Sequence, residues 1–484
     1  MNVTAIIKWF FSNILIINIL LAILIVFFER RNPTSVWAWL LILFFIPIVG
    51  FILYLFLGQD LRRKKMFKGK EEEDHIQQMI HIQERSIDEN EFTFTDPNLN
   101  SFTDMVGFHL RSNNALFSAN NKVEILLDGE EKFSKLKESI KNAKEYIHLE
   151  YYIIRNDALG KEMIDLLAQK AEEGVEVKLL YDGMGCIWLP RKFFNPIIKA
   201  GGQVSAFFPP FIPYFNLRMN FRNHRKICIV DGQEGFVGGF NIGVEYLGQA
   251  PKFGFWRDTH FYLRGNAVDG LQARFLLDWN FSSVLNKITN DTKYFPIKED
   301  EGDVGVQIVS SGPDSKWYGI KNGFLKMIME AEKSIYIQSP YFVPDDSILE
   351  ALKVAVLSGV DVRIMVPNKP DHPFVYWASL SYLGELVQAG ARCYTYEKGF
   401  IHCKTMMVDG LVNTVGTANM DIRSFKLNFE VNAFVYDAEI TRQLETIFMQ
   451  DIEDSEEMTI ERYEQRSYWI RMKESVSRLL SPIL

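Results

Sequence analysis

The 484-residue sequence predicts an α/β protein built from two related lobes, preceded by a pair of membrane helices. Three observations lead to this fold class: two uncharged apolar stretches near the N-terminus, a strand–helix–strand pattern that occurs twice, and one set of polar residues repeated at one spacing. An apolar fraction of 48% is typical of a globular protein. Four cysteines without close spacing argue against a disulfide framework or a cysteine-ligated zinc site, and a net charge of −8 argues against a general nucleic-acid binder.

The two apolar stretches predict a membrane hairpin. Residues 9–28 and 36–57 contain no charged side chain, and about twenty apolar residues in a helix cross a hydrocarbon core of roughly 30 Å. Because the basic cluster that follows favours the cytoplasmic side, we expect residues 1–60 to form two transmembrane helices with both ends in the cytoplasm. Pro47 and Gly50 leave open a second segment that enters the bilayer without crossing it. A cleaved signal peptide is the other alternative, although no small-residue cleavage pattern is present.

A charged linker separates the hairpin from the rest of the chain. It is basic at first and then acidic, and we expect residues 61–97 to be a linker without chemistry, whose acidic part is a solvated segment or a short helix. Its basic residues, which also suit contact with anionic lipids, are Arg62, Arg63, Lys64, Lys65, Lys68 and Lys70.

The remaining sequence is an internal duplication. Residues 143–182 and 331–368 each show an apolar strand, a polar turn, an amphipathic helix ended by a glycine, and a second strand. This alternation predicts largely parallel sheets with helices outside. We therefore expect one lobe over 98–300 and a second over 301–484, related by a pseudo-two-fold axis and facing each other across a cleft.

Both copies carry the same polar motif. A histidine is followed by a lysine two residues later, an aspartate five residues after that, and an asparagine seventeen residues beyond the histidine. Two such matches in register with the repeat exclude coincidence. The residues are His224, Lys226, Asp231 and Asn241 in the first copy, and His402, Lys404, Asp409 and Asn419 in the second.

The spacing indicates how these side chains are presented. We expect residues 221–230 and 400–408 to be strands, so that the histidine and the lysine of each motif share one strand face. Asp231 and Asp409 each precede a glycine, and although they are counted among the catalytic candidates, we expect them mainly to organise the turn at the strand end. Cys403 should point to the opposite face, into the core.

Two imidazoles, two ammonium groups and two amides suit chemistry on a phosphodiester. The lysines and asparagines would hold the non-bridging oxygens, one imidazole would attack phosphorus, and the other would protonate the departing alkoxide. Fixed cations take the place of a metal, and no carboxylates cluster with the histidines, so we expect neither a metal nor another cofactor.

Each histidine needs a partner that fixes its tautomer. An acid within a strand-like segment follows each motif, 34 residues after the first histidine and 28 after the second. We therefore expect Asp258 to orient His224 and Glu430 to orient His402.

The doubled motif resembles that of the phospholipase D superfamily, and the whole chain is similar to its bacterial cardiolipin synthases. Residues 32–39, 421–425 and 481–484 carry further similarity. The resemblance implies an enzyme of the bacterial cytoplasmic membrane that needs no nucleotide activation. One phosphatidylglycerol would form a phosphatidyl-histidine on His224 with His402 as the acid, and a second phosphatidylglycerol would then attack, giving cardiolipin and glycerol reversibly.

Other functions stay open at this stage. Water as the acceptor would make the protein a phospholipase D that releases phosphatidic acid. A nuclease of the same superfamily and an inactive membrane scaffold are disfavoured, by the apolar stretches and by the complete motifs respectively. The aromatic, proline-rich segment 207–215 fits buried packing or a lip that contacts lipid equally well. The acceptor range and the oligomeric state are not indicated, and the histidines expected to be structural are His75, His81, His109, His148, His260 and His372.

Overall fold

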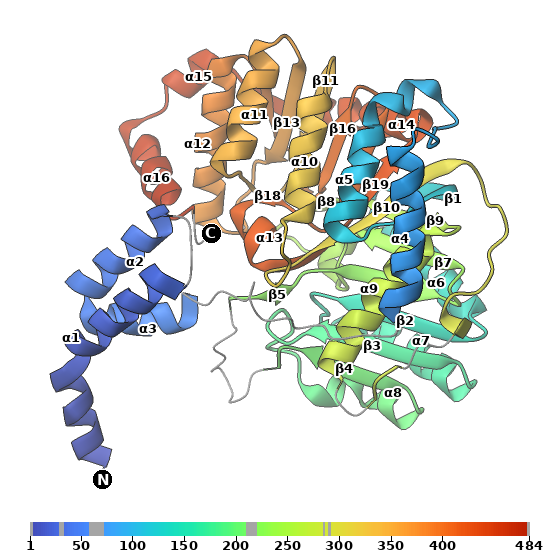
Figure 1. Ribbon diagram of the computed structural model, residues 1–484, viewed down its shortest axis with the longest axis horizontal. Helices are drawn as coiled ribbons and strands as arrows, with labels where there is room; N and C mark the ends of the chain where they lie inside the picture. The colour runs from blue at the N-terminus through green and yellow to red at the C-terminus, as the bar shows by residue number, and fades with distance from the viewer. Residues whose placement is uncertain are drawn as a thin grey trace. The chain divides into compact units, whose positions relative to one another are not determined.

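The computed structural model describes residues 3–28, 33–57, 72–209, 220–283, 286–288 and 292–481 (Figure 1). The N-terminal helices belong to one compact unit and the duplicated part of the chain to another. The basic cluster of residues 62–70 and most of the aromatic segment lie outside the described residues.

The second apolar stretch is not a single helix, as the expected second crossing would require. After α1 (Val3–Phe28), the chain forms α2 (Pro33–Phe45) and α3 (Pro47–Leu57), with a bend between them. The rings of Trp39 and Tyr54 lie 5.3 Å apart, although 15 positions separate them in the chain. Since a straight helix rises about 1.5 Å per residue, such a contact requires α3 to fold back along α2.

Proline causes this break, and α1 stabilises it. Pro47 has no N–H to donate to the carbonyl of Leu43, four residues earlier. The buried side chain of Asn18 in α1 supplies the missing donor. Its amide nitrogen donates to Leu43 O at 3.1 Å and to Pro47 O at 3.0 Å. A Cβ on Gly50 would lie 2.7 Å from the carbonyl oxygen of Ile42, so the reversal also needs a residue without a side chain. Among the described residues, no helix combines the length and apolar character needed to span a bilayer.

The duplicated part forms one 16-stranded mixed sheet whose halves repeat each other. The first half runs β1-β9-β7-β6-β2-β3-β4, and the second half runs β10-β19-β17-β16-β11-β13-β14-β20 in the same topological order. Strand β1 joins the halves, because residues 117–121 pair with β10 and residues 122–126 pair with β9. The sequence repeat is thus a structural repeat.

The elements of the first half follow the chain from the linker onward. Its helices are α4 (Glu72–Asp88), α5 (Thr103–Asn113), α6 (Gly129–Asn142), α7 (Ala158–Glu172), α8 (Asn195–Lys199) and α9 (Ala267–Ser282). Its strands are β1 (Phe117–Leu126), β2 (Tyr146–Tyr151), β3 (Glu176–Asp182), β4 (Gln203–Phe207), β5 (Arg222–Asn223), β6 (Lys226–Val230), β7 (Glu234–Gly238), β8 (Phe255–Arg257) and β9 (His260–Arg264).

The second half repeats this series and adds elements at its end. Its helices are α10 (Gly319–Glu330), α11 (Asp346–Leu357), α12 (Pro373–Ala389), α13 (Ile422–Lys426), α14 (Ala438–Glu453), α15 (Ile460–Glu464) and α16 (Tyr468–Leu479). Its strands are β10 (Val304–Ser311), β11 (Ser334–Gln338), β12 (Phe342–Val343), β13 (Asp361–Pro367), β14 (Arg392–Tyr396), β15 (Gly399–Ile401), β16 (Thr405–Val408), β17 (Val412–Gly416), β18 (Met420–Asp421), β19 (Asn428–Tyr436) and β20 (Ser455–Met458).

The expectation of largely parallel sheets was wrong for the strands that carry the motifs. The strands β2-β3-β4 and β11-β13-β14 are parallel, because helices α7, α8, α11 and α12 return the chain between them. Strands β6 and β7 pair antiparallel, as do β16 and β17. Their tight turns hold Asp231 and Asp409 at φ +52° and +57°, each followed by a glycine with positive φ. Each polar motif therefore lies on a hairpin.

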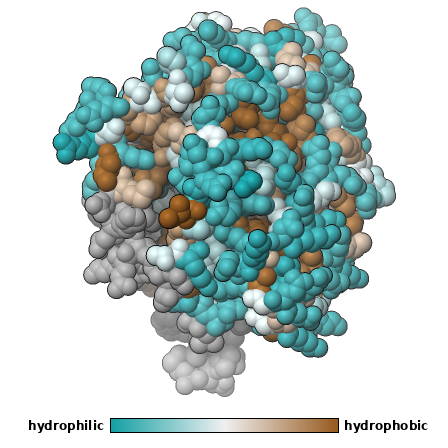
Figure 2. Space-filling view, turned by 90° about the vertical axis from the view of Figure 1, so that its right-hand side faces the viewer, coloured by the Kyte–Doolittle hydropathy of each residue, from teal (hydrophilic) through white to brown (hydrophobic). Residues whose placement is uncertain are grey.

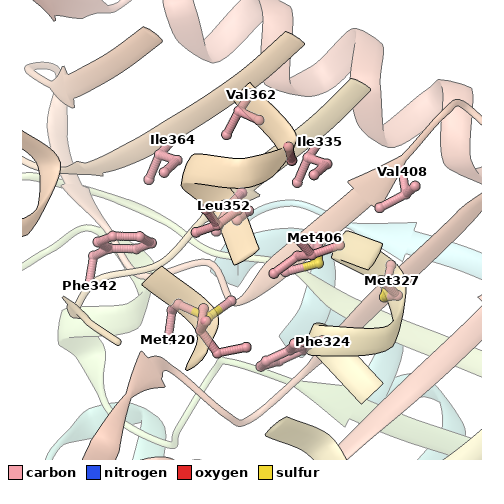
Figure 3. Close-up of a cluster of buried hydrophobic side chains, with 14 of the residues drawn as sticks. Phe324, Met327, Ile335, Phe342, Leu352, Val362, Ile364, Met406, Val408 and Met420 are labelled. Carbon is pink, nitrogen blue, oxygen red and sulfur yellow. The ribbon is translucent and has the colours of Figure 1, made fainter. Parts of the chain in front are cut away.

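Apolar side chains on both faces of the sheet hold these hairpins in place. In the second half, α10, α11 and α12 lie over β11 and β13 (Figure 1). Leu352 and Phe342 are fully buried with Ile364 and Met406 in that core (Figure 3). Burying one such side chain contributes roughly 1.5–3 kcal/mol. On the face shown in Figure 2, hydrophilic residues make up most of the coloured surface.

Candidate active site

Both predicted motif strands break at their histidine. Residues 221–230 form β5 and β6, and residues 400–408 form β15 and β16, with a short irregular stretch between them in each case. At the break, His224 N donates to Phe429 O at 2.9 Å, and His402 N donates to Arg257 O at 2.7 Å. Each histidine is therefore bonded through its backbone to the other half of the duplication.

The acids that contact the imidazoles are exchanged relative to the expected pairs. His224 Nδ1 lies 3.0 Å from each oxygen of Glu430, and His402 Nδ1 lies 2.7 Å from Asp258 Oδ2. The expected pairing within each half was wrong. Strand β5 pairs in parallel with β19 and β15 with β8, so each histidine segment runs beside the acid-bearing strand of the other half. Since Nδ1 of each ring is occupied, Nε2 is the atom left to react.

The structure brings the two lysines to the same place. Lys226 Nζ donates to His224 O at 2.6 Å, and Lys404 Nζ donates to His402 O at 2.5 Å. Burial is the main cause of the low pKa of both imidazoles, and the positive charges of both lysines lower each of them further. The lysines are buried and the two histidines are each 8% exposed, so little of the site is accessible from solvent.

Burial sets the protonation states of this site. It lowers the pKa of His224 and of His402 to about 4, against the opposing effect of their carboxylate partners. Burial, reinforced by the charge of Lys404, lowers the pKa of Lys226 to about 7 although Glu430 opposes it. The protein alone therefore keeps both imidazoles neutral at pH 7, the form that can attack phosphorus. A phosphodiester anion beside them would raise both pKa values.

The two asparagines of the motifs differ in their contacts. Asn241 is engaged within its own half, since its Oδ1 accepts from Ile153 N at 3.1 Å and its Nδ2 donates to Tyr246 OH at 3.1 Å. Asn419 is also buried, and its Oδ1 has no hydrogen-bond partner among the residues that the structure describes. Because an amide oxygen only accepts hydrogen bonds, a contact of Asn419 with a phosphate oxygen would have to come from its Nδ2.

Asp231 and Asp409 are not brought to the histidines. Asp231 accepts hydrogen bonds at 2.8, 2.8 and 2.9 Å from the backbone amides of residues 144, 145 and 146. Asp409 makes the same three contacts with residues 332, 333 and 334, at 2.8, 2.7 and 2.8 Å. Both lie at the far end of the motif strand, where they join its turn to the start of the neighbouring strand. This geometry gives them a structural task and corrects their inclusion among the catalytic candidates.

A buried ion pair behind the first histidine escaped sequence analysis. Arg225 is 1% exposed, and its guanidinium contacts Asp278 at 2.6 Å and the carbonyl of Glu430 at 3.2 Å. Breaking such a pair leaves an uncompensated buried charge, which costs several kcal/mol (about 3–5). Strand alternation already placed position 225 in the core, so a charged residue there was the available signal.

The corresponding position in the second half is Cys403, which faces the core as expected. Its sulfur lies 3.4 Å from the hydroxyl of Thr259, and burial raises the pKa of the thiol to about 12. Of the aromatic segment, Phe207 and Phe208 are buried and pack on Phe429, beside the first histidine. Among the residues described, no group of three or more His, Cys, Asp or Glu side chains is arranged to hold a metal ion.

Comparisons with known proteins converge on these features. A family described as "Cardiolipin synthase, PLD-like domain" matches residues 136–249 and 324–452, which contain both motifs, and one described as "Phospholipase_D-nuclease N-terminal" matches residues 16–59. The major cardiolipin synthase of Bacillus subtilis is 52% identical over 98% of both chains. A cardiolipin synthase of Listeria monocytogenes is 52% identical over 97% of this chain and 98% of its own.

A solved structure agrees in fold. The phosphatidylserine synthase of Haemophilus influenzae superposes with a TM-score of 0.61 at 16% identity, covering 79% of this chain and all of its own. At this level of identity the likeness concerns the duplicated fold alone.

Proposed function

The chain belongs to the cardiolipin synthase family of phospholipase D-like proteins, and from that membership we propose a complete reaction for it. It is a phosphatidyltransferase, a cardiolipin synthase. We propose that donor and acceptor are both phosphatidylglycerol, and that residues 98–300 and 301–484 act as the two lobes that share the site. The observation that supports this proposal is that each histidine is hydrogen-bonded, through its backbone N–H and its imidazole Nδ1, to residues of the other half.

In the first step, Nε2 of His224 attacks the phosphorus of one phosphatidylglycerol. The bound phosphodiester anion raises the pKa of His402, which is therefore protonated at this point. The bond from phosphorus to the headgroup glycerol breaks, and His402 gives its proton to the departing oxygen. Lys226 and Lys404 hold the non-bridging oxygens throughout, with Asn419 and Asn241 as further phosphate ligands. Glu430 stabilises the positive charge that develops on His224.

In the second step, His402 is neutral and acts as the base. It takes the proton from the free glycerol hydroxyl of a second phosphatidylglycerol, whose oxygen attacks the phosphatidyl-histidine. The phosphorus–nitrogen bond breaks, cardiolipin leaves, and the site returns to its first state. The first step exchanges a phosphorus–oxygen bond for a phosphorus–nitrogen bond and the second step does the reverse, so the overall reaction exchanges one phosphoester for another, is reversible and needs no other reactant. Burial of the two histidines and the two lysines limits the access of water, which would otherwise give phosphatidic acid.

We propose that the N-terminal unit lies in the bacterial cytoplasmic membrane and that the catalytic unit faces the cytoplasm. The apolar side chains of α1–α3 are widely exposed, up to 71% for Phe44 and Phe45. Apolar surface of this extent calls for a nonaqueous neighbour. The basic cluster at 62–70 suits anionic headgroups on the cytoplasmic leaflet. In this arrangement α2 and α3 enter and leave the membrane on one side.

Incubating the purified protein with phosphatidylglycerol alone tests the reaction. Cardiolipin and glycerol in equal amounts support it, phosphatidic acid with glycerol indicates hydrolysis, and no product indicates an inactive scaffold. His224→Ala should abolish both the products and the phosphatidyl adduct. The matched control is His372→Ala, whose side chain is 70% exposed and should leave the rate unaffected. A covalent adduct that survives His224→Ala would contradict the assignment of the nucleophile.

A further inference from the structure

We propose that helix α16 is a membrane contact of the catalytic unit, and that it lies flat in the surface of a bilayer that contains anionic phospholipids. This contact is additional to the N-terminal unit, so the inference goes beyond the proposed function. It rests on that proposal only for the choice of phosphatidylglycerol as the lipid.

Helix α16 buries polar residues and exposes apolar ones. Its buried residues are Glu474 and Ser477, which are 3% and 1% exposed. Five of its large apolar residues are exposed instead, from 41% for Met472 to 81% for Leu479. These five residues are Tyr468, Trp469, Met472, Val476 and Leu479. An amphipathic helix on the surface of a soluble domain normally turns its apolar side inward, so α16 has the orientation of a helix whose apolar side faces another partner.

The five exposed residues form one apolar stripe along α16. Successive residues of a helix are rotated by about 100°, so all five positions fall within about 100° of its circumference. Single exposed apolar side chains are ordinary on a protein surface, whereas a contiguous apolar patch marks a contact with a protein or a membrane. The 12 residues of α16 span about 18 Å, which is too short to cross a hydrocarbon core of roughly 30 Å. A membrane contact of α16 would therefore lie in the plane of the bilayer.

Contacts on the polar side hold α16 in this orientation. Glu474 accepts from Arg466 Nε at 3.0 Å. The guanidinium of Arg478 lies 4.4 Å from the centre of the Tyr382 ring in α12, and its Nη1 donates to Ser381 Oγ at 3.4 Å. Because these contacts fix the polar side against the second half, the apolar stripe is presented outward.

The charges of α16 indicate a lipid surface rather than a second copy of the chain. The acid of this helix is Glu474, which is buried, whereas Arg471 and Lys473 are exposed on either side of the stripe. Cations beside an apolar stripe, with Tyr468 and Trp469 at one end of it, are typical of helices that lie in the interface of an anionic membrane. A second copy docked on the stripe would bring these like charges close together, which is unfavourable.

Helix α12 connects this surface to the second motif. The hydroxyl of Ser379 in α12 accepts from Phe342 N at 3.0 Å. Phe342 lies in β12 and pairs with Met420 of β18, which directly follows Asn419. A bilayer bound at α16 would therefore hold this part of the site near the surface from which a lipid enters.

The first test measures contact with lipid. Met472→Cys and Leu479→Cys are made singly in the full chain, whose native cysteines are buried, and are labelled with a fluorophore. Each protein is reconstituted in vesicles of phosphatidylglycerol with a nitroxide-bearing phosphatidylcholine. We expect the nitroxide to quench both labels at least about threefold more than a label at Met329→Cys. Met329 is the matched control because it is 72% exposed and lies in α10, outside the stripe. In vesicles of phosphatidylcholine alone, quenching at α16 should be weaker because the flanking cations lose their anionic partners.

The second test measures activity. The double variant Trp469→Ser, Leu479→Ser should convert phosphatidylglycerol in vesicles at least about fivefold more slowly than the wild type, and should convert a soluble short-chain phosphatidylglycerol at the wild-type rate. Met329→Ser should match the wild type on both substrates. The short-chain substrate reports how much of each variant is folded and active.

Equal quenching at all three labels would overturn the proposal, as would an equal loss of activity on both substrates. Labels that are protected from the nitroxide, together with a disulfide between copies through Val476→Cys, would assign the stripe to a second copy and overturn it as well. A wild-type protein that makes no cardiolipin would instead contradict the proposed function, and the quenching experiment, which needs no turnover, would still decide whether α16 contacts lipid.

Discussion

The exchanged acid–histidine pairs make a prediction about which acid controls which step. Glu430→Gln keeps the shape of the side chain and removes its charge from His224, whereas Asp258→Asn does the same for His402. Although Glu430 follows the second motif in the chain, we expect its variant to impair the attack by His224. Asp258→Asn should impair proton transfer by His402.

The contacts set the size of the effect. The carboxylate of Glu430 is fully buried, lies 3.0 Å from His224 Nδ1, and also accepts from Asn428 Nδ2 at 3.0 Å. A hydrogen bond to a charged group contributes about 1.5–3 kcal/mol, and each 1.36 kcal/mol corresponds to a factor of ten in rate, so the first step should slow by about 10- to 150-fold. Asp258, 2.7 Å from His402 Nδ1, should give a loss in the same range.

The direction of the pH shift separates the two variants. Glu430 raises the pKa of His224 against burial, so its removal lowers that pKa. The attacking imidazole must be neutral, and the acid limb of the rate profile should therefore move to lower pH. Asp258 likewise raises the pKa of His402, which must be protonated to act as the acid. In Asp258→Asn the alkaline limb should move to lower pH.

The assay is the first-turnover release of radiolabelled glycerol from phosphatidylglycerol between pH 5 and pH 9, with the adduct located by mass spectrometry after quenching. If the adduct is on His224 and Asp258→Asn, rather than Glu430→Gln, moves the acid limb, the exchanged pairing is refuted. If the adduct is on His402, the two limbs should exchange their responses.

Three further predictions concern other parts of the molecule. Asp231→Ala should lower the free energy of unfolding by roughly 1.5–3 kcal/mol because three backbone amides lose their acceptor, while the first-turnover yield per folded molecule stays unchanged; a folded but inactive variant would contradict the structural task. Sulfate should bind less tightly at pH 8 than at pH 6 in calorimetry, by up to about tenfold per pH unit, because Lys226 loses its proton above its pKa of about 7. The Lys226→Met variant should show no such dependence of sulfate affinity on pH. Cysteines introduced singly at Ser35 and Leu57 should both react with an impermeant maleimide from the same side of sealed vesicles. The background should be low because the native cysteines are buried. Labelling from opposite sides would mean that the second apolar stretch crosses the bilayer.

Short-range features of the fold follow from the sequence. The Asp-Gly pairs predicted turns, and both adopt the positive φ angles that such turns need. Glycines at 174 and 359 predicted helix ends, and both have φ near +95°. The histidine and the lysine two positions later were expected to share a face, and both lysines bond to the carbonyl of their own histidine.

The parallel pairs within each repeat were predicted, but the pairing of the motif strands and the acid that contacts each histidine were not. Local periodicity is the same in parallel and antiparallel strands that are buried on both faces, so the hairpins carrying the motifs were not distinguished. The acids were assigned by distance along the chain, yet Glu430 reaches His224 only because β5 lies along β19. The helix break at Pro47 was foreseeable as an alternative, but its stabilisation by Asn18 required the packed helices.

The shared strand β1 restricts how this enzyme can admit a lipid. The first residues of β1 pair with β10 and its last residues pair with β9, so β1 joins the two halves by backbone hydrogen bonds. A hinge motion that separates the halves would break these hydrogen bonds. It would also separate both imidazoles from their carboxylate partners. Entry and exit must therefore depend on rearrangements of loops and side chains at the rim, while the reacting groups stay in a frame that does not open.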